Sequence, residues 1–281
     1  MVEALHYSSE TTPDLRNHQL LCHQGVAHIW DLWLEMTSIF STTIPLMVGM
    51  GNHEYDHTGG GEGKDPSGVK SSSGYMPEWG NFGDDSGGEC GVPTSKRFIA
   101  PANGNGIFWY SWDYGLVHTI MLSSEHDLSP GSDQYTWLAQ NLASVDRSLT
   151  PWVIVESHRP LYMNLYSPDD LKVGFHTRMH IENLLKDHAV DLFLAGHYHS
   201  YFRSCPGLYG NKCNNGGLTH ITVGTAGAAL EMDRALRRSW VANYSRDWGY
   251  GRITVANATA LYFEFVSDAD GITHDSTWIY R

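Results

Sequence analysis

The chain is poor in basic residues and contains no long apolar run. Its 281 residues include 18 Lys and Arg against 31 Asp and Glu, which gives a formal net charge of −13. Proteins that bind the nucleic-acid backbone or an anionic membrane surface usually present a basic face. No segment reaches the ~18 consecutive apolar residues that a membrane span needs. We therefore expect neither a nucleic acid nor a membrane as the partner.

Cysteines are also few, since the sequence contains 4. Cys205 and Cys213 flank a loop rich in Pro, Gly and Asn, which could fold back and close a small disulfide. Two free thiols are the alternative. A zinc site is less favoured because the sequence lacks the closely spaced Cys-x-x-Cys pairs of such sites. We expect the disulfide, and the Asn-x-Ser/Thr acceptors at Asn243 and Asn257 agree with a secreted protein.

The order of hydrophobic patterns predicts an α/β chain. Helical periodicity indicates helices, one of them with Ser132 as its N-cap, and short apolar or β-branched runs indicate strands. After about residue 218 the pattern changes to antiparallel strands, and no linker marks a second independent domain. The expected helices lie at residues 28–40, 132–146 and 177–190, and the expected strands and hairpins lie at 44–50, 106–124, 152–158, 191–199 and after 218.

Polar side chains follow three of these apolar runs. They occur in "LMVGMGNHE", "WVIVESHRP" and "LFLAGHYHS", and they include Asn52, His158, His197 and His199. In an open α/β sheet, the loops at the carboxyl ends of neighbouring parallel strands converge. Imidazole and amide groups suit Zn, Fe or Mn. The two histidines of "HYH" would point the same way on a strand but can diverge on a loop, so they could serve one metal or two.

These segments resemble ordered motifs of the purple acid phosphatases, within the binuclear metallophosphoesterase superfamily. The likeness extends to "GNHEYD", "GGECGVP", "SSEHD" and "AGHYHSYFRSC", and it covers residues 28–281. It implies an α/β fold, a β-sandwich of two mixed sheets flanked by helices, with the antiparallel strand region at the C-terminus. We expect residues 28–281 to form an incomplete catalytic domain and residues 1–27 to form an irregular segment.

The resemblance also implies roles for individual residues. Asn52, His158 and His197 would hold a divalent metal (Zn, Mn or Fe(II)), and His199 would bind Fe(III). His53 would contact the phosphate and help to protonate the leaving group. The implied reaction is hydrolysis of small phosphate monoesters at acidic pH by a metal-activated hydroxide. The family is secreted or vacuolar, although the start of this chain shows no signal-peptide pattern.

Two upstream family motifs, which carry an Asp ligand, a bridging Asp and a Tyr, are not found in this sequence. In the segment that best matches the second motif, Gln19 occupies the place of the bridging Asp and Cys22 that of the Tyr. Asp14, His18, His23 or Cys22 could replace the missing ligands, but no spacing argument supports any of them. We interpret the chain as N-terminally truncated, and we expect it to bind about one divalent metal.

The substrate-binding residues are harder to assign from the resemblance. Plant members carry phosphate-binding histidines soon after the "SH" motif, and this chain has none there. Arg159, Tyr162 or the later His176 could take their place. The cluster in "SSEHD", residues 123–127, has no ligand role in the family, so we interpret it as structural.

Three functions from different classes remain open. The first is a metal-dependent acid phosphatase. The second is a non-catalytic truncated relative that holds one divalent metal, and the third is a phosphodiesterase of the same superfamily. The upstream aspartates would separate the first two functions, and the width of the pocket would separate the first from the third. The sequence leaves the oligomeric state open.

Overall fold

The computed structural model describes residues 26–55, 66–69 and 91–281 as an α/β chain. The helices are α2 (Val26–Ser41), α3 (Asn52–Tyr55), α4 (Val92–Arg97), α5 (Asp133–Ser144) and α6 (Pro168–Asp187). The strands are β1 (Tyr110–Tyr114), β2 (Val117–Leu122), β3 (Trp152–Ser157), β4 (Leu192–Ala195), β5 (Tyr201–Ser204), β6 (Thr219–Val223), β7 (Val241–Ser245), β8 (Gly249–Val255), β9 (Ala260–Ser267) and β10 (Thr273–Tyr280). No helix in the described part of the chain is long and apolar enough to cross a membrane.

The strands form two sheets. The larger sheet has seven strands in the order β1-β2-β3-β4-β6-β5-β7, and it is mixed because β2, β3, β4 and β6 run parallel while the other pairings are antiparallel. The smaller sheet, β10-β9-β8, is antiparallel throughout. The predicted C-terminal antiparallel region is thus confirmed. The expectation of two mixed sheets is wrong for the smaller one, because short turns connect its successive strands.

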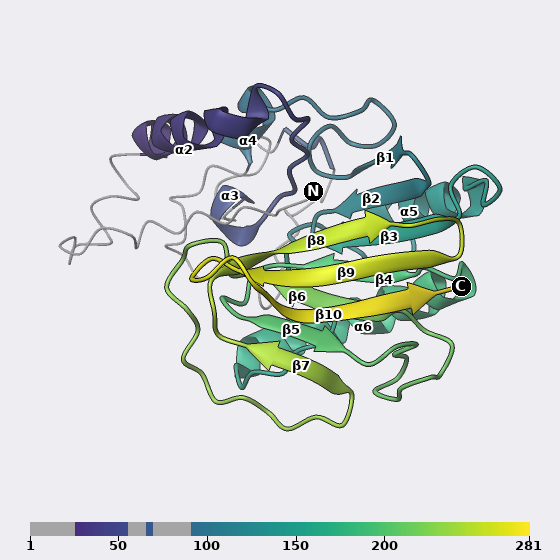
Figure 1. Ribbon diagram of the computed structural model, residues 1–281. Helices are drawn as coiled ribbons and strands as arrows, with labels where there is room; N and C mark the ends of the chain where they lie inside the picture. Colours follow the sequence, from purple (N-terminus) through teal and green to yellow (C-terminus); the bar gives the residue numbers. More distant parts are fainter. Residues whose placement is uncertain (1–25, 56–65, 70–90) are drawn as a thin grey trace.

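The two sheets and the helices pack in three layers, with the smaller sheet on one face of the larger sheet and α5 and α6 on the other (Figure 1). Successive side chains of a strand point to opposite faces of the sheet, so one strand can contribute residues both to the contact between the sheets and to the contact with the helices. Ile154 of β3 packs with Phe263 of β9 between the sheets. Val153 and Val155, the neighbours of Ile154, pack instead with the apolar residues of α5 and α6. Because both faces of β3 are covered, all six of its residues are buried.

Helix α5 shows how local sequence fixes an element of this layer. The Ser132 side chain accepts a hydrogen bond from the backbone N–H of Tyr135 at 3.2 Å, so it caps the helix as predicted. Leu138 and Leu142 are buried on one face of the helix. The other two predicted helices also form, as α2 and as α6, which begins at Pro168 and is longer than expected.

Residues 44–50, which we predicted to form a buried strand, do not form one in the structure. The Val48 carbonyl accepts a hydrogen bond from Tyr110 Oη at 2.7 Å, and Met50 is fully buried in a cluster with Phe108. A strand needs a neighbouring strand to complete its hydrogen bonds, and this segment pairs with none of the described strands. The apolar run therefore indicates packing rather than sheet pairing.

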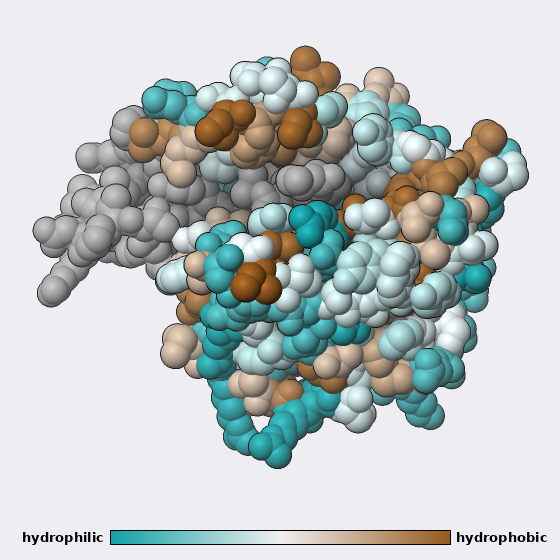
Figure 2. All heavy atoms as spheres, in the orientation of Figure 1, coloured by the Kyte–Doolittle hydropathy of each residue, from teal (hydrophilic) through white to brown (hydrophobic). Residues whose placement is uncertain are grey.

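Helix α2 buries one face against the rest of the protein and leaves an apolar stripe exposed on another face. Trp33 and Thr37 are buried, whereas Leu32, Met36 and Ile39 are exposed by 39%, 62% and 84%. These three residues lie at i, i+4 and i+7, so they share one helical face. Hydrophobic atoms are visible at the surface over this part of the molecule (Figure 2).

The candidate metal centre

Three of the expected ligands lie in contact at one edge of the larger sheet. His158 Nε2 is 2.6 Å from Asn52 Oδ1 and 3.0 Å from His197 Nδ1. His158 directly follows β3, and His197 lies two residues after β4. Because β3 and β4 are adjacent and parallel, their carboxyl ends lie at the same edge. A hydrogen bond of 3.0 Å from Gly196 N to the His158 carbonyl joins the two loops.

The backbone at the third ligand is unusual. His197 has φ of 65°, which is the left-handed region that side chains with a Cβ rarely adopt. Non-Gly residues in this region are enriched where function requires a particular side-chain direction. Here the turn after β4 brings the His197 ring to His158, with ring centroids 4.9 Å apart. The local cost of this backbone therefore serves to bring the two rings together.

The site is largely shielded from water. Asn52 and His158 are 8% and 5% exposed, and the His197 side chain is 16% exposed. Burial lowers the pKa of His197, and the nearby Arg159 guanidinium lowers it further, although Asp170 acts in the opposite direction. Neutral imidazole is the form that binds metals. The environment therefore favours the protonation state that a ligand requires.

Asp170, in the first turn of α6, lies on the other side of the His197 ring. Its Oδ1 is 3.0 Å from His197 Nε2 and 3.2 Å from Arg159 Nη1, and its Oδ2 accepts a hydrogen bond from Ser167 at 2.6 Å. Burial alone would raise the pKa of this carboxyl. The hydrogen bonds from His197 and from the Ser167 hydroxyl outweigh that effect and lower the pKa below its usual range. Asp170 is therefore ionised across the functional pH range.

No sequence pattern marked Asp170 as part of the site. The segment "SPDD" marks a helix start, with Ser at the N-cap and Pro in the first turn. That signal accounts for α6 but says nothing of which distant loop the helix start will face. Only the packing of α6 against the edge of the sheet places the carboxylate beside His197.

His199 and His53 occupy different positions from the three contacting ligands. His199 Nδ1 lies 2.7 Å from the Ala229 carbonyl, to which it donates a hydrogen bond. That arrangement leaves Nε2 as the nitrogen for a metal. His53 is the second residue of α3 and follows Asn52 directly. The roles expected for His199 and His53 stay predictions.

Arg159, a candidate phosphate ligand, is engaged by acidic side chains. It is only 3% exposed, and its Nε donates to Glu125 Oε1 at 2.7 Å while its Nη1 faces Asp170. The backbone N–H of Arg159 also donates to Ser124 Oγ at 3.2 Å. A buried guanidinium paired with two carboxylates is better suited to holding the site than to binding a substrate. The segment "SSEHD" supplies Glu125 to this arrangement, in agreement with its structural interpretation.

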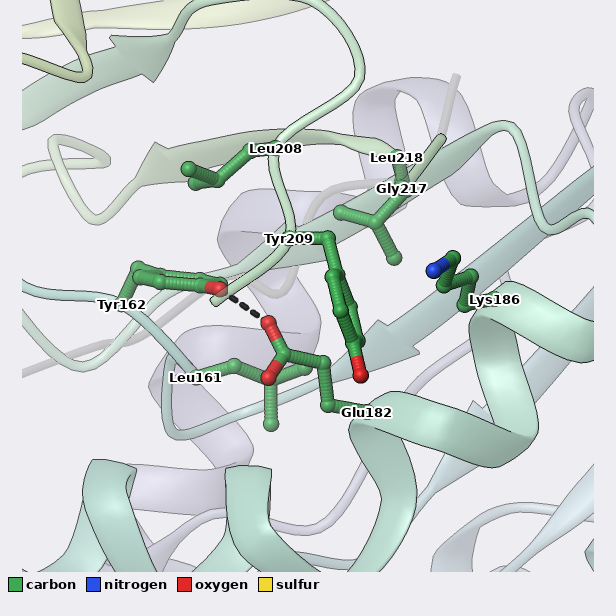
Figure 3. Close-up of a pocket in the computed structure, with 8 residues that line it drawn as sticks. All are labelled: Leu161, Tyr162, Glu182, Lys186, Leu208, Tyr209, Gly217 and Leu218. Carbon is green, nitrogen blue, oxygen red and sulfur yellow. Dashed lines mark hydrogen bonds between the residues drawn. The ribbon is translucent and has the colours of Figure 1, made fainter. Parts of the chain in front are cut away.

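The structure places Tyr162 away from this cluster. Its hydroxyl points to Glu182 of α6 at the edge of a small pocket between α6 and the loop after β5 (Figure 3). That pocket has a volume of about 10 Å³, which is room for one water molecule. The ring of His176, the third candidate, contacts His180 on α6, with centroids 4.2 Å apart. Neither contact links these two residues to the metal site.

The donors at the site fit a divalent metal. In the described parts of the chain, no group of three or more His, Cys, Asp or Glu side chains could hold a metal ion, so Asn52 is needed to complete a set of three donors. Two imidazole nitrogens and one amide oxygen suit Zn, Mn or Fe(II). At Zn–ligand distances of about 2.0–2.1 Å, tetrahedral donors lie about 3.3 Å apart. The observed spacings of 2.6 and 3.0 Å would therefore have to widen by about 0.7 and 0.3 Å. The described residues do not include Asp14, His18, Cys22 or His23, which we considered as replacement ligands. They also do not include residues 1–25 of the expected irregular segment 1–27.

The cysteines and asparagines that led us to expect a secreted protein can also be placed. Cys205 and Cys213 form the expected disulfide, which closes the loop after β5. Asn243 lies half-buried in β7, opposite Arg203 of β5. Asn257 is exposed in the turn between β8 and β9, where its Oδ1 accepts a hydrogen bond from the Thr259 hydroxyl at 3.0 Å. Glycosylation at the two asparagines stays a prediction.

Comparison with known proteins identifies the class. The family model of the calcineurin-like phosphoesterases matches residues 14–201, and that of the iron/zinc purple acid phosphatase-like protein C matches residues 217–276. The chain therefore belongs to the calcineurin-like phosphoesterases, and specifically to those of the purple acid phosphatase type. The expectation drawn from the motifs is confirmed at this level.

Individual relatives differ in the activity that their names state. The chain is 33% identical to "Probable inactive purple acid phosphatase 27" of Arabidopsis thaliana, over 99% of this chain and 46% of the relative. It is 30% identical to a nucleotide pyrophosphatase/phosphodiesterase of Hordeum vulgare, over 99% of this chain and 76% of the relative. A purple acid phosphatase from yellow lupin seeds superposes with a TM-score of 0.74 at 31% identity, over 90% of this chain and 43% of that one. The chain thus spans about half the length of the curated relatives named inactive that it matches.

Proposed function

We propose that this chain is a divalent-metal-dependent phosphoesterase that hydrolyses small phosphate monoesters under acidic conditions. The observation that carries the proposal is the position of His158 Nε2, which lies 2.6 Å from Asn52 Oδ1 and 3.0 Å from His197 Nδ1. Membership of a phosphoesterase family whose C-terminal part is of the iron/zinc type supports it. Asn52, His158 and His197 would hold the divalent ion, whereas the position of His199 binds a second ion, Fe(III), in the family.

A bound divalent ion would polarise the phosphoryl oxygens and lower the pKa of water, which is the chemistry that this reaction needs. The protein residues supply the remaining steps. His53, next to Asn52, would donate a hydrogen bond to the phosphate and a proton to the leaving oxygen. Histidine donates a proton as the imidazolium, which acidic conditions populate. This requirement matches an acidic working range.

Two other functions have specific support. The relatives named probable inactive purple acid phosphatases favour a chain without turnover. The barley relative, named a nucleotide pyrophosphatase/phosphodiesterase, favours hydrolysis of diesters. The described residues supply three donors for one metal position and only His199 for a second, so one bound metal is the expected stoichiometry.

The decisive experiment combines metal analysis with two substrates. The purified chain should bind about one zinc equivalent, show no visible charge-transfer band, and hydrolyse p-nitrophenyl phosphate near pH 5 faster than bis-p-nitrophenyl phosphate. His197→Ala should abolish zinc binding, whereas His53→Ala should spare zinc and remove turnover. Two bound metals with a purple colour, or equal loss of zinc in both variants, would refute the assignment. Zinc binding without turnover of either ester would favour the non-catalytic function.

A further inference from the structure

The carboxylate of Asp170 and the candidate metal face lie on opposite nitrogens of one imidazole ring. His197 Nδ1 is 3.0 Å from His158 Nε2, and His197 Nε2 is 3.0 Å from Asp170 Oδ1. Metal-binding histidines in proteins almost always donate their other ring N–H to a carboxylate, carbonyl or water, which fixes the tautomer and the ring direction. The geometry around His197 has this arrangement.

The position of the proton on His197 follows from its neighbours. Asn52 Oδ1 can only accept, so His158 Nε2, at 2.6 Å, must carry the hydrogen that joins them. The same His158 N–H also faces His197 Nδ1 at 3.0 Å. A second hydrogen on His197 Nδ1 would point into that contact. This contact favours the lone pair on Nδ1, and the neutral ring then carries its hydrogen on Nε2, where Asp170 accepts it.

Asp170 is itself held in place. Arg159 Nη1 is 3.2 Å from Asp170 Oδ1, and Glu125 accepts from Arg159 Nε at 2.7 Å. Arg159 and Glu125 are 3% and 5% exposed, so these ion pairs are screened little by solvent. Ser167 donates to the second carboxylate oxygen. Each of the two carboxylate oxygens thus has a donor that restricts its rotation.

We propose that Asp170 is a positioning residue, which fixes the Nε2–H tautomer of His197 and so directs the Nδ1 lone pair to the metal position. Arg159 and Glu125 hold Asp170 in this role. The consequence for metal affinity rests on the proposed function, because it requires His197 to be a ligand. The tautomer of the metal-free ring does not depend on that function, so the two can be tested separately.

One competing arrangement has a clear signature. Arg159 Nη1 also lies 3.3 Å from His197 Nε2, and it could donate to this nitrogen if the ring carried its hydrogen on Nδ1. The lone pair would then face Arg159 instead of the metal position. Asp170 would in that case contact only Arg159 and Ser167, and its removal would leave the tautomer of His197 unchanged.

The first arm of the test measures zinc affinity by calorimetry in Asp170→Ala and Asp170→Asn. Loss of a carboxylate that orients a metal-binding histidine typically weakens binding 10–100-fold. We expect the Ala variant to lose close to 100-fold, and the Asn variant about tenfold because its amide oxygen can still accept the hydrogen bond. Asp133→Ala is the matched control, since Asp133 is an exposed carboxylate in the first turn of α5. It should bind zinc as the parent chain does.

The second arm records 15N NMR spectra of the histidine rings in the metal-free chain near pH 7.5, with the His197 signals identified from their loss in His197→Ala. The parent chain should show a protonated Nε2 and an unprotonated Nδ1, and Asp170→Ala should give a mixture of tautomers. A ring protonated on Nδ1 in the parent, or the same tautomer in the parent and in Asp170→Ala, would overturn the proposal. If zinc does not bind the parent chain at all, the proposed function fails, and this second arm still decides the role of Asp170.

Discussion

His220 is a buried histidine that the proposed chemistry does not use, and it makes a strong prediction about stability against pH. It lies in β6 with no exposed surface, and its ring is stacked between Phe193 and Phe202. Its Nε2 accepts a hydrogen bond from the backbone N–H of Leu161 at 3.1 Å, so its hydrogen is on Nδ1. Within residues 26–55, 66–69 and 91–281, Nδ1 has no hydrogen-bond partner. Burial, followed by the charge of Arg178, lowers the pKa of His220 to about 3.

The sign and size of the effect follow from this shift. In the unfolded chain the same ring has a pKa of about 6.5, so the unfolded state takes up a proton as the pH falls below that value. The native state stays neutral until about pH 3, so the free energy of unfolding decreases as the pH falls between the two values. The loss is about 2 kcal/mol between pH 7 and pH 5 and reaches about 5 kcal/mol when the native ring also titrates.

The assay is urea unfolding of the parent chain and of His220→Gln at pH 7 and pH 5. The Gln side chain can offer an oxygen to the Leu161 N–H but does not titrate, so the variant should lack this loss. We expect the parent to lose about 2 kcal/mol more than the variant between the two pH values. Burial raises the pKa of Glu156 to about 8, which has the opposite dependence, with stability falling as the pH rises from about 4.5 to 8. Glu156 is present in both proteins, and its effect cancels in the comparison.

Parallel pH profiles for the two proteins would refute this reasoning. They would mean that His220 is protonated in the native state, or that the Phe193 and Phe202 rings admit water around it. His220→Phe provides a second comparison. It also lacks the titration, but it leaves the Leu161 N–H without an acceptor, so it should be less stable than His220→Gln at both pH values by about 1–3 kcal/mol.

Two further predictions concern the link between the sheets and the backbone at the site. Asp275 of β10 accepts two hydrogen bonds from Arg203 of β5, at 2.7 and 2.9 Å. Asp275→Ala should lower the free energy of unfolding in urea by about 2 kcal/mol, because it leaves a half-buried guanidinium unpaired. A change below about 0.5 kcal/mol would show that solvent replaces the pair. At His197, whose φ is 65°, the Gly variant should be more stable to urea than the Ala variant by about 1 kcal/mol. Both variants lose the ring, and only Ala keeps a Cβ in the left-handed backbone conformation, so equal stability would contradict a strained backbone.

The part of the site that the sequence predicted depends on strand ends. "WVIVESH" and "LFLAGH" are apolar runs that end in polar residues, and each run forms a buried strand of the larger sheet. Residues at the ends of adjacent parallel strands must lie close together, so the contact between His158 and His197 could be predicted without coordinates. The helix that begins after Ser132 was predictable for a similar reason, because capping is a local interaction.

The parts that the sequence did not predict depend on long-range packing. Residues 44–50 have the composition of a strand, but strand pairing requires a neighbour, and the apolar run cannot specify one. Strands β5 and β7 are short and pair with each other in an antiparallel register, without a local pattern that would separate them from loops. Asp170 is the functional example, since it meets His197 across 27 positions of sequence only because α6 begins beside the end of β4.

The segment "GHYH" shows how one backbone angle separates two histidines whose directions the sequence left open. On a regular strand His197 and His199 would point to the same side, and either one metal or two could be served. Because His197 has φ of 65°, the alternation is interrupted at this residue. Its Nδ1 faces His158, while the Nδ1 of His199 donates to the Ala229 carbonyl on the loop after β6. The two histidines therefore have different hydrogen-bonding partners, and a single metal ion held by Asn52, His158 and His197 does not require the side chain of His199.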